Sequence, residues 1–191
     1  TIPFGANPVK RKIIKNPNPK NMRYLFVGNV DFRKGVPEIL QAFSDNSFKN
    51  DELILLGKKT REMNKFLKGT KNVHYMGFRN PEKFYLTSDV FLFPSWCEGS
   101  AKVIYEAMSY GLPIITTFSS GSIIKNDEGG FLVEPGSIKS IKNAMSKLKD
   151  TNIYNKISKK NLEKIKQFTW EEYSKKVSLE YSKYLNSRNA N

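Results

Sequence analysis

The chain has 191 residues, of which 39% are hydrophobic and 13% aromatic, so it can form a folded core and is not a disordered chain. No apolar run approaches the roughly 20 residues that a membrane-spanning helix needs. The single cysteine, Cys97, excludes an internal disulfide and a multi-cysteine metal site, and is typical of a cytosolic protein with a reduced thiol. Because the chain has no initial methionine, we expect it to be a piece of a longer protein.

The net charge of +14 is concentrated at the two ends of the chain. Residues 136–191 carry +8, whereas residues 24–135 are neutral. Residues 1–23 carry +6, from Lys10, Arg11, Lys12, Lys15, Lys20 and Arg23. Such charge is typical of binding to nucleic acid or to an anionic membrane, and also of lysine-rich helix faces in water. Composition alone leaves these three interpretations open.

The chain begins with an extended, proline-rich stretch, after which strands and helices alternate. Short continuous apolar runs that end at Gly or Pro predict strands at 24–27, 52–56, 72–76, 90–93, 113–116 and 130–133. One-sided apolar patterns predict helices at 35–43, 60–68, 81–87 and 102–110, and a helical turn at 119–125. From residue 137 onward the pattern is helical only, with segments near 137–149, 151–167 and 169–186.

This order of elements predicts an α/β fold. The strands are continuous apolar runs rather than alternating ones, which is typical of a parallel sheet covered on both faces. We therefore predict a doubly wound parallel sheet of about six strands with helices on both faces. Ligands of such sheets bind at the carboxyl ends of the strands, where the strand order reverses.

The segment after the first strand carries two adjacent cations, Arg33 and Lys34, directly before a helix. It contains neither a dinucleotide fingerprint nor a P-loop. A helix start offers free N–H groups and a positive dipole, so this segment is suited to bind a phosphate. The alternative is a cationic turn in water.

The segment after the fourth strand carries Glu98 in a loop and Glu106 in the following helix, eight residues apart. Both carboxylates can line one crevice, and a carboxylate can accept two hydrogen bonds from adjacent hydroxyls of a ribose or hexose. Gly99 permits close approach of a ligand to the backbone. The alternative is that Glu98 caps the helix and Glu106 is an exposed surface acid.

Several segments, in the right order, resemble the family 4 retaining glycosyltransferases. Glu98 and Glu106, with Gly99 after the first and Ala107 and Met108 after the second, are similar to the EX7E motif of that family. VG at 27–28, KG at 34–35 and PS at 94–95 match short motifs of that family. Longer segments are similar to its motifs: SYGLPII at 109–115 to AxGxPVI, GGFLV at 129–133 to GxLV, IPFGA at 2–6 to an IPNG-type segment, and FTWE at 168–171 to FSW. The resemblance covers nearly the whole chain.

The resemblance implies a GT-B architecture, in which two Rossmann-like domains face each other across a cleft. This chain would then be the C-terminal half, with a linker at 1–23, a nucleotide-sugar-binding domain at 24–150 and C-terminal helices at 151–191. Its implied function is retaining transfer of a sugar from a nucleotide sugar to a glycan or lipid-linked acceptor, in polysaccharide biosynthesis. We expect it to be inactive without an N-terminal acceptor domain. We also expect a cytoplasmic location, with peripheral attachment to the membrane.

The resemblance also implies roles for individual residues. Lys34, helped by Arg33, would pair with the diphosphate, while Glu106 would hold the ribose. Glu98 would contact the donor sugar, which makes it the candidate catalytic residue. The other expected donor-binding residues are Gly28, Phe78, Arg79, Gly99, Ser100 and Ala101. The family often has arginine where this chain has Asn29, so either Arg33 supplies that cation or phosphate binding is weaker.

We expect no cofactor and no metal, because the sequence has no DxD motif and only one histidine, His74. Two alternative functions remain at this stage. One is a basic nucleic-acid-binding module, which would interleave cations with exposed aromatic residues. The other is an epimerase or phosphorylase of GT-B architecture, although no sequence context for a pyridoxal phosphate lysine is evident.

Overall fold

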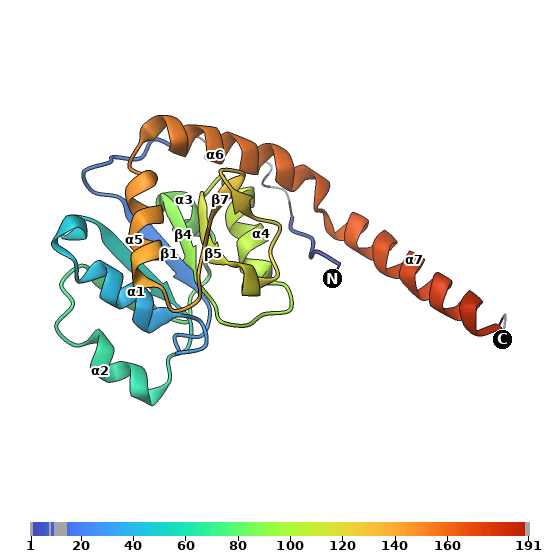
Figure 1. The fold of residues 1–191 in the computed structure, drawn as a ribbon, viewed down its shortest axis with the longest axis horizontal. Coiled ribbons are helices and arrows are strands. Elements are labelled where there is room, and N and C mark those ends of the chain that lie inside the picture. The colour runs from blue at the N-terminus through green and yellow to red at the C-terminus, as the bar shows by residue number, and fades with distance from the viewer. Residues whose placement is uncertain (1, 8, 10–14, 190–191) are drawn as a thin grey trace.

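The computed structural model describes residues 2–7, 9 and 15–189, which form one parallel sheet with helices on both faces (Figure 1). The seven strands are arranged in the order β3-β2-β1-β4-β5-β7-β6, and every pairing is parallel. This confirms the predicted doubly wound, Rossmann-like sheet, with one strand more than expected. The strands are β1 (Arg23–Val27), β2 (Glu52–Leu56), β3 (Val73–Gly77), β4 (Val90–Phe93), β5 (Ile114–Thr117), β6 (Lys125–Asn126) and β7 (Gly129–Val133).

The central strands are buried on both faces, as their continuous apolar sequences predict. In β1, Tyr24, Leu25 and Phe26 are all inaccessible to solvent. All four residues of β4 are buried as well. A strand that is covered on both faces has no solvent-facing positions, which explains why its sequence does not alternate.

Strand β6 is the one that the sequence did not predict. Its two residues, Lys125 and Asn126, are exposed and pair with the start of β7 at the edge of the sheet. The predicted helical turn at 119–125 is only partly right. The helical part is the 3₁₀ helix Phe118–Ser120, and the chain then enters β6.

The helices form two layers. The crossovers from β1 to β2 and from β4 to β5 run in opposite directions across the sheet, so right-handed connections place α1 and α4 on opposite faces. Helix α5 packs against α1, and α6 packs against α4. The α-helices are α1 (Val36–Phe43), α2 (Asn64–Leu67), α3 (Glu82–Thr87), α4 (Lys102–Ser109), α5 (Ile138–Lys147), α6 (Thr151–Lys164) and α7 (Trp170–Asn189).

The strand order reverses between β1 and β4, and the loops that follow these two strands are in close contact. The Trp96 amide donates to the Arg33 carbonyl over 2.9 Å. Gly35, just before α1, has φ 71°, and a Cβ atom there would lie 2.2 Å from the Pro94 carbonyl oxygen. Only glycine tolerates both this backbone conformation and this approach. The fold therefore fixes the two loops against each other at the expected ligand-binding edge.

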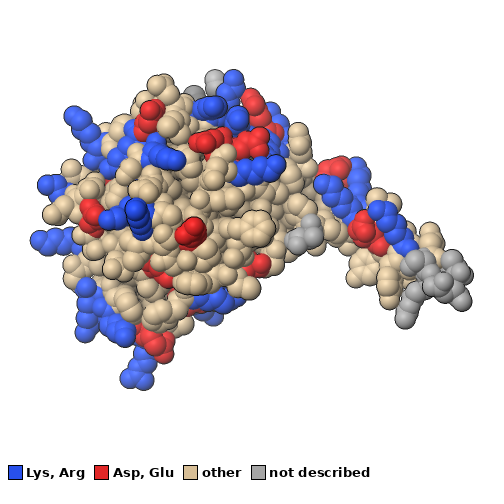
Figure 2. Space-filling view, in the orientation of Figure 1, with Lys and Arg blue, Asp and Glu red and all other residues tan. Residues whose placement is uncertain are grey.

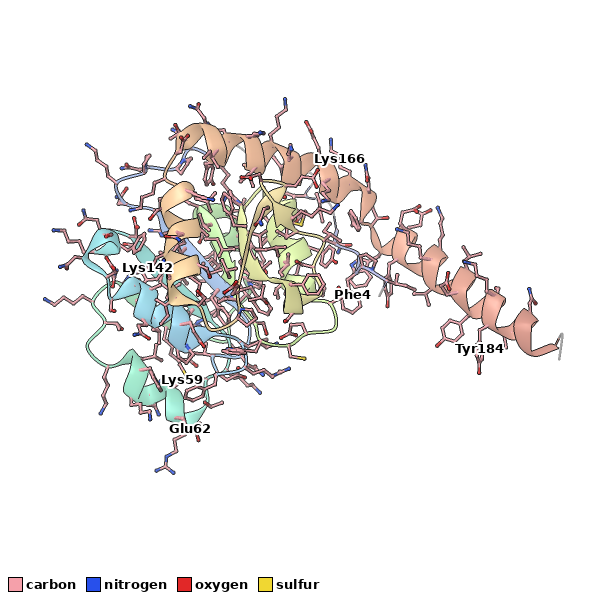
Figure 3. All side chains as sticks on the ribbon, in the orientation of Figure 1. Phe4, Lys59, Glu62, Lys142, Lys166 and Tyr184 are labelled. Carbon is pink, nitrogen blue, oxygen red and sulfur yellow. The ribbon has the colours of Figure 1, made fainter. Side chains whose placement is uncertain are left out.

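The N-terminal segment packs beside the start of α7, which projects away from the sheet (Figure 1). The Ala6 amide donates to the Phe168 carbonyl over 2.8 Å. Phe4 contacts Trp170 and Tyr173, with ring centroids 6.2 and 5.4 Å apart, and Figure 3 shows Phe4 next to this helix. Three cations predicted for the basic N-terminal stretch, Lys10, Arg11 and Lys12, lie outside the described residues.

Basic side chains are distributed around the periphery of the face seen in Figure 2, whereas its centre is largely uncharged. On α6, Lys156 and Lys159 are exposed, as is Lys166 in the 3₁₀ turn that follows it (Figure 3). Within the described residues, no helix has both the length and the apolar character that are required to cross a membrane.

Candidate active site

A cavity of about 660 Å³ opens at the carboxyl ends of β1, β2 and β3. This volume lies within the range of about 300–1,000 Å³ that is typical of small-molecule sites. The lining residues are Val27, Gly28, Asn29, Leu56, Gly57, Lys58, Phe78, Arg79, Pro81, Lys102 and Glu106. The structure thus brings together four of the predicted site residues, namely Gly28, Phe78, Arg79 and Glu106.

The wall of this cavity includes Glu106, whose carboxylate is held from two sides. Its Oε1 pairs with Lys102 Nζ at 2.9 Å, and its Oε2 accepts a hydrogen bond from the Tyr85 hydroxyl at 3.1 Å. The Glu106 side chain is 27% exposed and paired on both oxygens, so the alternative that Glu106 is an exposed surface acid is wrong. Burial, followed by the charge of Glu106, raises the pKa of Tyr85 far above its usual value. Tyr85 therefore stays protonated and acts as a hydrogen-bond donor to the carboxylate.

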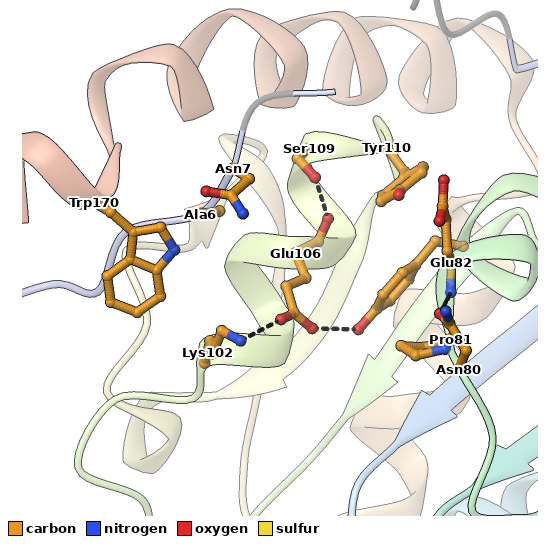
Figure 4. A pocket seen from close by; sticks show the side chains of 11 residues that line it. Ala6, Asn7, Asn80, Pro81, Glu82, Lys102, Glu106, Ser109, Tyr110 and Trp170 are labelled. Atoms are coloured by element: carbon orange, nitrogen blue, oxygen red, sulfur yellow. Dashed lines mark hydrogen bonds and ion pairs between the residues drawn. The ribbon is translucent and has the colours of Figure 1, made fainter. Parts of the chain in front are cut away.

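Glu106 also lines a second cavity of about 370 Å³ (Figure 4). It shares Pro81, Lys102 and Glu106 with the larger cavity. Its other lining residues are Ala6, Asn7, Asn80, Glu82, Tyr85, Ser109, Tyr110 and Trp170. The ion pair between Lys102 and Glu106 therefore lines both cavities.

The other predicted carboxylate, Glu98, forms an ion pair with Lys34. The two side chains are only 15% and 10% exposed. Glu98 Oε1 also accepts a hydrogen bond from the Ser95 hydroxyl at 2.8 Å. Helix α4 begins after Ala101, without a side-chain cap, so the alternative that Glu98 caps this helix is wrong. Arg33 is exposed, whereas Lys34 is buried. The alternative of a cationic turn in water therefore fits Arg33 but not Lys34.

The loop between Glu98 and α4 is supported by the segment after β5. The Glu98 amide donates to the Ser119 carbonyl at 2.8 Å, and the Ala101 amide donates to the Ser120 carbonyl at 3.1 Å. The amide of Ala101, which was expected to meet the donor, is thus already paired in this structure. A Cβ atom built on Gly99 would meet nothing within 4 Å among the described residues. A ligand can therefore approach the backbone at Gly99.

The predicted residues thus form two groups. Gly28, Phe78, Arg79 and Glu106 line the large cavity, whereas Lys34 and Glu98 lie with Gly99, Ser100 and Ala101 in the loops that follow β1 and β4. Two contributors were missed. Lys102 lies four residues before Glu106 on one helix, a spacing that predicts an ion pair. No sequence signal links Tyr85 to Glu106. In the described part of the chain, no cluster of three or more potential metal-binding side chains occurs.

The family model for glycosyl transferases group 1 matches residues 9–166 of this chain. The chain belongs to this family. One curated relative is the capsular polysaccharide biosynthesis glycosyltransferase CapM of Staphylococcus aureus, which is 33% identical over 134 residues. Another is the Escherichia coli UDP-Gal:alpha-D-GlcNAc-diphosphoundecaprenol alpha-1,3-galactosyltransferase, which is 39% identical over 98 residues. These matches cover 64% and 50% of this chain, but only 35% and 25% of the length of the two relatives.

Two solved structures have the same fold as this chain. WaaG, a glycosyltransferase involved in lipopolysaccharide biosynthesis, matches with a TM-score of 0.77 and 22% identity, over 92% of this chain and 54% of its own. Anabaena HepE, in complex with UDP and glucose, matches with a TM-score of 0.74 and 19% identity, over 86% of this chain and 49% of its own. The chain therefore spans about half of each solved structure, in agreement with one Rossmann-like domain of a GT-B enzyme.

Proposed function

We propose that this chain is the donor-binding half of a retaining glycosyltransferase that uses a nucleotide diphospho-sugar. The observation that carries the proposal is the position of Glu106 in the wall of the 660 Å³ cavity, at the carboxyl edge of the sheet. A carboxylate at this place can accept hydrogen bonds from both ribose hydroxyls of a bound nucleotide. Each oxygen of Glu106 has one protein partner, and a carboxylate oxygen can accept a further hydrogen bond.

The base of the nucleotide would lie near Phe78 and Arg79. The Phe78 side chain is 82% exposed, so its ring is available to stack on a base. Gly28, at the end of β1, lines the same cavity and lets the nucleotide approach the backbone. This arrangement leaves the diphosphate and the sugar to extend toward the loops that carry Lys34 and Glu98.

In this scheme Lys34 and Glu98 separate when the donor binds. The ammonium of Lys34 would turn from Glu98 to the diphosphate, with Arg33 as a second cation, and Glu98 would accept hydrogen bonds from the sugar hydroxyls. The amides of Gly99, Ser100 and Ala101, before the first turn of α4, would face the phosphate and the sugar. The Ala101 amide would have to exchange its bond to Ser120 for one to the ligand.

The chemical step requires stabilisation of the leaving diphosphate. Negative charge develops on the leaving group while the anomeric carbon gains oxocarbenium character, and the charges of Lys34 and Arg33 oppose that negative charge. The leaving phosphate itself would accept the proton of the acceptor hydroxyl, with retention of configuration. This scheme needs no divalent metal. The acceptor, a glycan or a lipid-linked sugar, would be bound by a domain that is not part of this chain.

The names of the relatives support this proposal over the two alternatives. CapM acts in capsular polysaccharide biosynthesis, and HepE was crystallised with UDP and glucose. Family membership favours sugar transfer over a nucleic-acid-binding module and over an epimerase or phosphorylase. Steep salt-dependent binding to DNA, without binding to any nucleotide sugar, would favour the nucleic-acid alternative.

The experiment is a thermal-shift series with UDP-, GDP- and ADP-sugars, each with and without a chelator. We expect one nucleotide class to raise the melting temperature, since a ligand that binds only the folded state stabilises it. The chelator should not change this shift. No shift with any donor would overturn the proposal, and a shift that disappears with the chelator would overturn its metal-independent form.

A further inference from the structure

Tyr85 is a buried residue that reaches the candidate site from a separate element. It lies on the six-residue helix α3 and is 2% exposed. Its ring stacks on Tyr110, with centroids 5.3 Å apart and planes at 21°, and also contacts Phe91 at 6.0 Å. These two ring contacts restrict the orientation of the Tyr85 side chain. In this orientation the Tyr85 hydroxyl donates a hydrogen bond to Glu106 Oε2 at 3.1 Å.

This hydrogen bond determines which part of Glu106 remains open to a ligand. Tyr85 engages Oε2. Lys102, from the same helix as Glu106, engages Oε1 (Figure 4). The Lys102 side chain is long and 53% exposed, so it can move when a ligand arrives. Tyr85 is rigid by comparison. The fixed partner of the carboxylate is therefore the tyrosine and not the lysine.

The position of Tyr85 is fixed in turn by Lys15, from the segment that precedes β1. Lys15 Nζ donates to the carbonyls of Tyr85, Leu86 and Ser88 at 2.7, 2.9 and 2.6 Å. The last carbonyls of a helix have no partner within the helix, and a cation at this end also opposes the helix dipole. Lys15 thus closes the end of α3 and joins the N-terminal segment to the turn that carries Tyr85.

We infer that Tyr85 is a positioning residue, fixed by Lys15 at the end of α3, which orients Glu106 to receive the two ribose hydroxyls of the donor. The inference rests on the proposed function, in which Glu106 binds the ribose. Tyr85 does not need to touch the ligand itself. Its effect is therefore confined to ligands that present ribose hydroxyls to Glu106.

The test compares Tyr85→Phe with Tyr154→Phe. Tyr154 is a matched control because it is also fully buried and loses one hydrogen bond, to the Asp89 carbonyl at 2.9 Å, outside the candidate site. Calorimetry would measure the affinity of the wild type, Glu106→Gln and both tyrosine variants. The probes are the best-binding diphosphate among UDP, GDP and ADP, and its 2′,3′-dideoxy counterpart.

We expect Tyr85→Phe to weaken the ribonucleotide by about tenfold, the effect of one hydrogen bond to a charged group, and to leave the dideoxy nucleotide unchanged. Tyr154→Phe should leave both affinities unchanged. Equal weakening of both nucleotides by Tyr85→Phe would overturn the inference, because the role of Tyr85 would then be general packing. Weakening by Glu106→Gln but not by Tyr85→Phe would also overturn it and leave the proposed function intact. If no nucleotide binds, or if neither Glu106→Gln nor removal of the ribose hydroxyls changes the affinity, the proposed function is overturned and the inference with it.

Discussion

Glu98 and Lys34 are 64 residues apart in the sequence, yet their side chains form an ion pair in the loops that follow β4 and β1. Both side chains are largely withdrawn from water. Two opposite charges in such a place depend on each other, because either one alone would be left without compensation. Loss of either charge alone should therefore destabilise the fold, apart from any effect on the proposed chemistry.

Lys34→Met should lower the free energy of unfolding by about 3 kcal/mol, since it leaves the Glu98 carboxylate without its counter-charge. Urea denaturation measures this loss. The double variant Lys34→Met/Glu98→Gln should recover a large part of the stability, because neither charge then remains. Simple addition of the two single effects would show that the residues are not energetically coupled.

Glu106→Ala should weaken nucleotide binding by about 10- to 150-fold, because a hydrogen-bonded charged contact contributes roughly 1.5–3 kcal/mol. Isothermal titration calorimetry with the preferred nucleotide measures the change. Glu163→Ala, at an exposed position of α6, serves as the control and should bind as the wild type does. An unchanged dissociation constant in Glu106→Ala would remove this residue from the site.

The pH dependence of stability should depend on Lys15. Desolvation lowers the pKa of Lys15 from 10.5 to about 8, against the opposing charge of Asp89. Between these values the unfolded chain holds a proton that the folded chain lacks, so the stability of the wild type rises with pH. Relative to Lys15→Met, which cannot titrate, the wild type should gain about 2 kcal/mol between about pH 7.5 and pH 9.5.

Urea denaturation of both proteins across this pH range checks the Lys15 prediction. At the alkaline end of this range, where the cost of burying the charge is smallest, the variant should be less stable than the wild type, because carbonyls at the end of α3 lose their donor. Parallel stability curves for the two proteins would show that Lys15 keeps an ordinary pKa in the folded state.

The basic surface of α6 and its following turn should bind anionic membranes. Each lysine close to such a surface contributes about 1 kcal/mol, so changing Lys156, Lys159 and Lys166 to Gln should reduce partitioning by about 100-fold. Liposome co-sedimentation measures this effect, with exposed Lys49, Lys68 and Lys71 changed to Gln as the charge-matched control. Equal partitioning of the protein to neutral and anionic vesicles, or binding to neither, would contradict this prediction. These lysines would then only form a hydrated surface of the helix.

The sheet was predictable because its central strands are buried, and burial leaves a clear trace in the sequence as continuous apolar runs. Strand β6 left no such trace, because Lys125 and Asn126 are exposed and polar and add no apolar run to the sequence. The positive φ of Asp127, at 60°, turns the chain between these two strands. A local pattern cannot indicate a strand that exists only through its neighbour.

The candidate site was predictable only where a local sequence pattern marks its residues. Glu98 and Glu106 stand out through their spacing along the chain, whereas Phe78 and Arg79 were expected only through the resemblance to a family. The contact of Lys34 with Glu98 and that of Tyr85 with Glu106 depend on tertiary packing. Side-chain contacts across such distances follow from the order of strands in the sheet, which one sequence does not reveal.

The close approach of Gly35 to Pro94 limits how this site can diverge. Insertions or bulkier residues in the loop after β1 would displace the loop after β4, so changes in these two loops have to occur together. The loop after β3 is under no such constraint, because Phe78 and Arg79 are exposed at its surface. Under the proposed function, engineering of the nucleotide base should therefore succeed most readily with libraries at residues 78 and 79, whereas variants at residue 35 should be eliminated as misfolded.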